Sequence, residues 1–310
     1  MIKFFLENKT IRLVLIMMFL TFLLLTLTGC GRDNQEIEEL NEKITEEIKY
    51  LDNRLIYMLN SLNNISYDNY TVLPIEIEEG KIPDAEKSSS TASKSEQKKE
   101  SEEDKNQEEQ KEEKKEQTKV ISGGILNNTN NQIDWGNIKK DIENLHDIWS
   151  TIILDLYKSN ADSTLILDFG KQLDVVTSNI EKEDKVNTII SLAELYQFIP
   201  QYSSSCLDDF LTNVYKTKAN IILSYSAVET DNWENVTKNL KNAEESFSNI
   251  MNNIEYKKEK EYAINKTYIL LKELQNSISM QDKNIYYIKY KNLIYEINMI
   301  SAWFIVKNYV

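Results

Sequence analysis

Apolar side chains recur every three or four residues over most of this chain, the spacing that places them on one face of an α-helix. The first such segment covers residues 35–63, and its apolar positions are Ile37, Leu40, Ile44, Ile48, Leu51, Leu55, Leu59 and Leu62. The repeat is close to the heptad of a coiled coil, with Glu and Lys on the other faces. It predicts a long amphipathic or coiled-coil helix over 35–63. We expect the rest of the chain to cover its apolar face, with self-association as the alternative.

A second region, residues 134–310, shows helical patterns from beginning to end. Asp134 is placed to cap its first helix, and Pro200 is expected to stop the third, because proline lacks an N–H group and its ring clashes with the preceding turn. A long helix is expected over 204–229, with another starting near Trp233. The predicted fold is all-α: antiparallel helical hairpins in a bundle or short α-solenoid-like array, with a leading long helix and a disordered charged insertion.

The charged insertion lies between these two regions. Residues 64–133 form a predicted linker, and from 81 to 119 the chain is almost entirely Glu, Lys, Ser, Gln and Asp, with no aromatic residue. Such a segment has too little apolar surface to offset the entropy of ordering, so 81–119 is predicted to be disordered. It is interpreted as a tether or as a tolerated loop insertion.

The N-terminus has the layout of an export signal. Lys3, Lys9 and Arg12 precede or border an apolar run at 13–27, which is shorter than the roughly 20 residues of a membrane-spanning helix. The run ends in Leu27-Thr28-Gly29-Cys30. These four residues resemble the lipobox of bacterial lipoproteins. Together with the leading helix, the charged insertion and a Tyr-rich helical body, the arrangement is similar to that of uncharacterised lipoproteins of low-GC Gram-positive bacteria.

The resemblance implies processing and a location. In that family a dedicated peptidase recognises the residues that correspond to Leu27-Thr28-Gly29 and cuts before the cysteine, here Cys30, whose sulfur carries a diacylglycerol. Residues 1–29 are then a signal peptide and residues 30–34 a lipid-anchored N-terminus. The protein is expected to be extracytoplasmic, held on the outer face of the cytoplasmic membrane through lipidated Cys30.

Charge and composition narrow the partners and the fold. The formal net charge is −14, and removing residues 1–29, with three basic residues and one acid, would make it −14 − 2 = −16. Nucleic acid is therefore not an expected partner. Only 7 Gly and 3 Pro occur, which disfavours sheet-rich folds with many tight turns.

One predicted hairpin has a second resemblance. Its residues Trp233, Val236, Leu240 and Ala243 are similar in spacing to the second helix of a tetratricopeptide repeat, in which such residues hold adjacent helices together. The similarity covers about one repeat and implies stacked antiparallel helices.

The sequence offers no motif for catalysis or metal binding. His146 is the only histidine, and on a polar helix face it fits solvated surface better than a metal site. Cys206 has no intramolecular partner once Cys30 is lipidated, and it is expected to behave as a small buried apolar residue. The chain is therefore predicted not to be an enzyme, and neither a cofactor nor a metal is expected.

The preferred functional hypothesis is a membrane-anchored helical module that binds a protein or peptide. The C-terminal helix is unusually apolar, and Tyr286, Tyr290, Trp303 and Phe304 form the candidate partner surface. The simpler interpretation is a buried closing helix.

The alternative hypothesis is a helical binding protein for a small molecule or a cell-wall polymer. Trp135, Trp149 and Trp233 would then contribute stacking in a cavity between helices.

Overall fold

The structure is a computed structural model, and it describes residues 30–65, 125–126, 132–159 and 161–309. The chain divides into two compact units, residues 1–73 with 123–310, and residues 74–122; all described residues belong to the first. The predicted signal peptide and the predicted disordered segment 81–119 lie outside the described residues.

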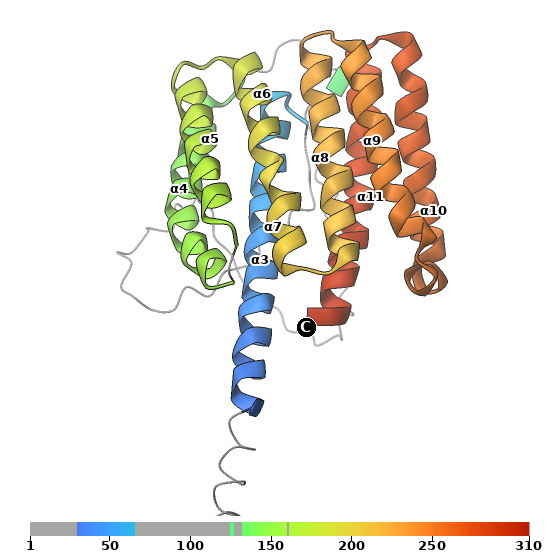
Figure 1. The fold of residues 1–310 in the computed structure, drawn as a ribbon. Coiled ribbons are helices and arrows are strands. Elements are labelled where there is room, and N and C mark those ends of the chain that lie inside the picture. Colours follow the sequence, from blue (N-terminus) through green and yellow to red (C-terminus); the bar gives the residue numbers. More distant parts are fainter. Residues whose placement is uncertain (1–29, 66–124, 127–131, 160, 310) are drawn as a thin grey trace, which may run out of the picture. The chain divides into compact units, whose positions relative to one another are not determined.

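The described residues are helical and contain no strand, which confirms the all-α prediction. The helices are α3 (Cys30–Leu62), α4 (Trp135–Lys158), α5 (Ser163–Glu181), α6 (Lys185–Tyr196), α7 (Phe198–Cys206), α8 (Asp209–Glu229), α9 (Trp233–Asn252), α10 (Ile254–Ser277), the short 3-10 helix η2 (Ile278–Met280) and α11 (Lys283–Tyr309). Helix α5, then α6 with α7 continuing below it, then α8 and α9 stand side by side in a row (Figure 1). Helices α4 and α3 cover one half of this row, and α11 and α10 cover the other.

Short polar side chains start most of these helices. The N-cap residues Asp134, Asp162, Asp184, Asp208 and Asn232 each accept a hydrogen bond from a backbone N–H of the first turn. Such a bond satisfies a donor that would otherwise have no partner within the helix. The predicted cap at Asp134 is confirmed, and the caps explain why a chain poor in Gly and Pro turns sharply between helices.

Two helix boundaries differ from the prediction. Helix α6 ends at Tyr196, and Pro200 lies in the first turn of α7, where its missing N–H has no intrahelical partner to lose. The single helix expected over 204–229 is broken at Leu207, because the extended backbone of Asp208 starts α8 by capping it. Pro200 therefore lies at the beginning of a helix instead of ending one. At Asp208, the capping hydrogen bond from the Phe210 N–H starts a new helix although the apolar period continues.

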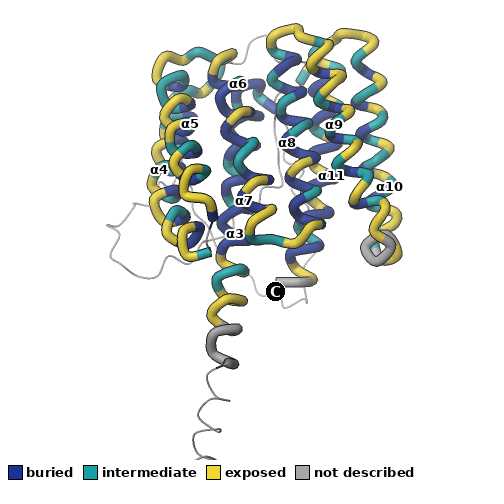
Figure 2. Tube along the Cα trace, in the orientation of Figure 1, coloured by how far each residue is buried: buried dark blue, intermediate teal, exposed yellow. Residues whose placement is uncertain are grey.

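The leading helix α3 is part of the same core as the body. It packs against α4, α6 and α7, and along its length Ile44, Ile48, Leu51, Leu55 and Leu59 are buried (Figure 2). Its end near Cys30 extends beyond the other helices, and Ile37 there is exposed (Figure 1). The expectation that the body covers α3 is therefore met, and α3 belongs to the same compact unit as residues 123–310.

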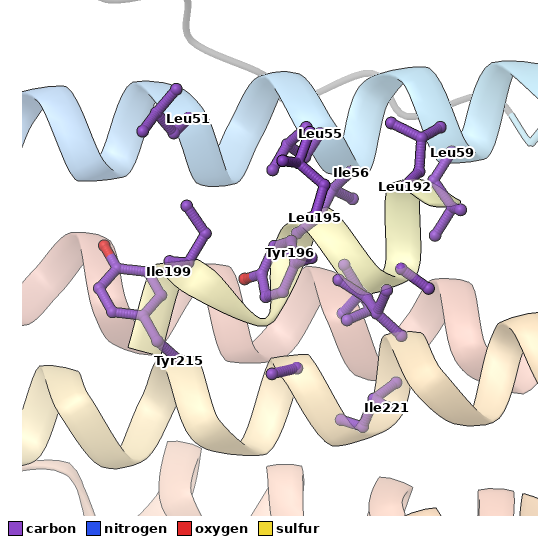
Figure 3. Close-up of a cluster of buried hydrophobic side chains, with 14 of the residues drawn as sticks. Leu51, Leu55, Ile56, Leu59, Leu192, Leu195, Tyr196, Ile199, Tyr215 and Ile221 are labelled. Atoms are coloured by element: carbon purple, nitrogen blue, oxygen red, sulfur yellow. The ribbon is translucent and has the colours of Figure 1, made fainter. Parts of the chain in front are cut away.

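One part of this core is a cluster of aliphatic and tyrosine side chains from four helices, α3, α6, α7 and α8 (Figure 3). It comprises Leu51, Leu55, Ile56 and Leu59 of α3, Leu192, Leu195 and Tyr196 of α6, Ile199 of α7, and Tyr215 and Ile221 of α8. All of them are buried, so the apolar face of α3 covers apolar side chains of α6, α7 and α8 that no other described element covers.

Candidate functional site

A buried ion pair joins α3 to α8. Lys218 Nζ lies 2.6 Å from Asp52 Oδ2, both side chains are almost fully buried, and the Tyr196 hydroxyl donates to the other Asp52 oxygen. Burial lowers the pKa of Lys218, although Asp52 acts in the opposite direction. Burial and the Asp52 carboxylate raise the pKa of Tyr196 well above its ordinary range. The three side chains satisfy one another's charge and hydrogen bonds, so their role is to hold α3 against α6 and α8.

A second buried set joins α3 to α4. Asp155 receives Lys43 Nζ at 3.0 Å and Lys158 Nζ at 2.9 Å, and Glu47 of α3 shares a hydrogen bond with the same carboxylate. Burial, with the Asp155 charge, raises the pKa of Glu47 to about 8. Although burial alone would raise the pKa of Asp155, hydrogen bonds from Lys158, Lys43 and Glu47 lower it. Glu47 therefore carries the shared proton at neutral pH.

A third set lies just after the end of α3. The Asn63 amide donates to Glu229 Oε1 and to the Tyr225 hydroxyl, each at 2.5 Å. The Tyr287 hydroxyl also donates to Glu229 Oε1 at 2.5 Å, and Lys185 Nζ is 3.6 Å from Glu229 Oε2. Together the three sets bind α3 along most of its buried length to α4, α6 and α8. In each set the carboxylates of Asp52, Asp155 and Glu229 are buried between helices, whereas Lys43, Lys158 and Lys185 reach the surface.

The two residues of greatest chemical interest in the sequence, His146 and Cys206, also have local partners. His146 Nε2 is 2.8 Å from Thr177 Oγ1, and its ring is half-buried between α4 and α5. Cys206 ends α7, half-buried, with Sγ 3.3 Å from Ser159 Oγ; burial raises the pKa of its thiol. A raised thiol pKa means less thiolate and weaker nucleophilicity. No group of three or more potential ligands for a metal occurs among the described residues.

The predicted partner surface is wrong for three of its four residues. Tyr286, Tyr290 and Phe304 are buried on α8: Tyr286 shares a hydrogen bond with Ser224, and the Phe304 ring stacks on Phe210 with centroids 4.4 Å apart. Their large side chains face inward because α11 packs through this face against α8, which α6, α7 and α9 contact as well. The interpretation of a buried closing helix therefore describes this side of α11.

Trp303 is the fourth residue, and it is half-buried at the edge of α11. Lys260 Nζ lies 5.1 Å and Lys307 Nζ 5.5 Å from the centroid of a Trp303 ring. Cations at these distances are attracted to the electron-rich face of an indole.

The opposite side of α11 carries an exposed apolar line that the sequence analysis missed. We name it the α11 stripe: Ile288, Tyr295, Met299 and Val306, with relative exposures of 36%, 37%, 52% and 62%. Spacings of seven, four and seven residues place all four on one face, over about 27 Å of helix. The signal in the sequence was a helix whose apolar residues are spread around its circumference, so that burying one side on α8 leaves apolar residues on the other.

The three tryptophans of the alternative hypothesis do not converge. Trp149 is buried with its ring 4.0 Å from that of Phe169 and 6.0 Å from that of Tyr202, so it packs the core between α4, α5 and α7. Trp135 starts α4 and Trp233 starts α9, which lie in different halves of the helix row (Figure 1). They cannot line one cavity together.

The residues of the second resemblance lie where a helical hairpin needs them. Val236, Leu240 and Ala243 are buried on one face of α9, which packs on α8, and Trp233 is half-buried at the start of α9. The α8–α9 pair is therefore a packed antiparallel hairpin.

The lipobox residues Leu27, Thr28 and Gly29 lie outside the described residues, and Cys30 is described only as the first residue of α3. In the part of the chain that the structure describes, no helix combines the length and apolar character that crossing a bilayer requires.

Comparison of the chain with protein-family models, with curated proteins and with solved structures gave no significant match.

Proposed function

We propose that this chain is a lipoprotein anchored through Cys30 on the outer face of the cytoplasmic membrane, and that its helical body is a non-catalytic protein-interaction module. The α11 stripe carries the second part of the proposal. An exposed line of apolar side chains on one helix face suits an amphipathic helix or an apolar peptide segment as a partner.

Charge and the buried polar groups support the same role. A net charge of −14 disfavours nucleic acid as a partner. The shifted pKa values of Glu47, Tyr196 and Lys218 belong to groups buried between helices, where they hold α3 in place. These shifts have a structural cause and do not require a catalytic one.

The interaction is tested by placing a charge in the α11 stripe. Met299→Glu is expected to change the free energy of unfolding by less than about 0.5 kcal/mol, because the side chain is 52% exposed. It should abolish crosslinking from a photoreactive residue installed at position 295 in the anchored chain. Leu167→Glu on α5, where the side chain is 65% exposed, is the matched control and should leave the crosslink intact. Equal crosslinking by both variants would show that the stripe is not the interface.

Anchoring needs its own test. Mass spectrometry of the membrane fraction should find a diacylglyceryl group on an N-terminal Cys30, and Cys30→Ala should release the protein from the membrane. An N-terminus other than Cys30, or membrane retention of the variant without lipid, would contradict the lipoprotein proposal.

A further inference from the structure

The directions of the helices decide which parts of the body face the anchor. Asp52 of α3 pairs with Lys218 of α8, and Asn63 with Glu229, so residue numbers rise together and the two helices run in the same direction. The start of α8 therefore lies at the same end of the body as the start of α3, where Cys30 is found (Figure 1).

Helices α10 and α11 bring further residues to that end. Phe210, at the start of α8, stacks on Phe304, near the end of α11, so α11 runs toward the anchor. Lys266 Nζ of α10 lies 2.6 Å from Glu296 Oε2 of α11, and Lys260 lies over Trp303. The start of α10 and the end of α11 thus form one corner at the anchor end.

This corner joins aromatic and basic side chains. We name Lys260, Tyr262, Trp303 and Lys307 the anchor-end corner. Tyr262 is 82% exposed, Lys307 is exposed, and both lysines lie over the Trp303 ring. The backbone of α10 departs from helical geometry at Lys260, with φ −130° and ψ 28°, directly beside this cluster. Trp and Tyr favour the headgroup region of bilayers, and lysines near an anionic membrane surface contribute about 1 kcal/mol each.

The part of α3 at the anchor end is acidic. The first turns of α3 carry Glu36, Glu38, Glu39 and Glu42, all exposed. Lys43 of α3 makes an ion pair with Asp155 of the body, and Cys30 precedes it by 43 − 30 = 13 residues, or about 20 Å of helix. A body held at this distance can tilt about its attachment point. An anionic surface repels the acidic side of α3 and attracts the anchor-end corner, so the tilt has a preferred direction.

We propose that the anchor-end corner is a second membrane contact, which binds the anionic lipid surface and orients the body on it. The proposal rests on anchoring through Cys30, because a tethered body meets the surface at high effective concentration and a weak contact is then sufficient. The α11 stripe rises from this corner along α11, so the contact also sets how far above the bilayer a partner would bind.

The test uses the chain from Cys30 onward, which contains every described residue, with Cys206→Ser so that Cys30 is the one thiol. The thiol is coupled to a maleimide lipid in vesicles of phosphatidylcholine and phosphatidylglycerol in roughly a 2:1 ratio, an anionic surface. Phospholipids brominated near the headgroup quench a tryptophan that reaches the interface. We expect quenching that Trp303→Phe removes, because Trp149 is buried and the other tryptophans start α4 and α9 at the far end.

Charge variants separate the corner from a general surface effect. Lys260→Glu with Lys307→Glu should lose most of the quenching, whereas Lys238→Glu with Lys241→Glu, an equal charge change on the exposed side of α9, should keep it. Quenching should also fall with salt and in pure phosphatidylcholine. Circular dichroism checks that each variant is folded.

Three outcomes would overturn the contact: no quenching in a folded, tethered chain, quenching that survives Trp303→Phe, or equal loss in both lysine pairs. Crosslinking of the corner to a protein partner together with absent quenching would assign the corner to that partner instead. Because the maleimide replaces the native lipid, a positive result remains valid even if Cys30 proves not to be lipidated in cells. Failure of the anchoring proposal and failure of this one are therefore distinguishable.

Discussion

Replacing Glu47 by Gln should make the stability of the protein much less dependent on pH. Glu47 lies on α3 with 2% of its surface exposed and shares a hydrogen bond with Asp155 of α4. Burial and the neighbouring Asp155 charge raise its pKa from 4.5 to about 8. A glutamine has nearly the same shape and can donate the same hydrogen bond, but it has no proton to lose.

The sign follows from proton binding. The folded state holds the Glu47 proton more tightly than the unfolded state, so the contribution of Glu47 to the free energy of unfolding is fully present below pH 4.5 and is lost as pH rises to about 8. The full shift corresponds to about 5 kcal/mol at about 1.36 kcal/mol per pH unit. The Lys43 and Lys158 side chains beside it are 49% and 63% exposed, so solvent screens the site, and we expect about 2–3 kcal/mol.

Urea unfolding followed by circular dichroism at several pH values between 5 and 9 measures this effect. The natural chain should lose about 2–3 kcal/mol more than Glu47→Gln over that range. The matched control is Glu42→Gln, an exposed residue on the same helix, which should leave the pH dependence unchanged. Parallel pH profiles for the natural chain and Glu47→Gln would refute the assignment of the proton to Glu47.

Other perturbations test the packing of α3 and of the helix row. Lys218→Met should lower the free energy of unfolding by about 3–5 kcal/mol, because it leaves the Asp52 carboxylate buried without its cation, and adding Asp52→Leu should recover most of the loss in urea unfolding. A chain reduced to 131–310 should aggregate or bind an apolar dye in size-exclusion experiments, since it lacks α3; a well-behaved monomer would show that α3 is dispensable. Leu240→Ala, at a fully buried site of α9, should lose about 2–5 kcal/mol in the same urea assay. Asn232→Ala removes the N-cap of α9 and should lose about 1 kcal/mol, whereas Asn232→Asp should lose little.

Prediction from the sequence succeeded where the signal is local. The apolar period placed α3, α4 and α9 within a few residues, and Asp134 was recognised as a cap. It failed at Pro200 and at Asp208, where the choice between continuing and restarting a helix depends on one capping bond and on the direction that the next helix must take.

The candidate partner surface on α11 shows the same difference between what the sequence predicts and what the packing decides. The apolar character of the last helix was evident, but Tyr286 and Tyr290 were assigned to the surface whereas Met299 and Val306 occupy it. A helix whose apolar residues are spread around its circumference has no continuous polar face to mark the outside. Only the position of α8 against α11 decides which side is buried.

By itself, the sequence determined that the chain is helical, where helices such as α4 and α9 begin, and that its N-terminus resembles a lipoprotein signal. These properties depend on residues within one or two helical turns of each other, so they can be read along the chain. The tertiary structure alone decided that α3 completes the core, that Asp52 meets Lys218, and that Lys260 meets Trp303. Contacts between residues so far apart in the chain depend on how whole helices pack, and no local pattern encodes them.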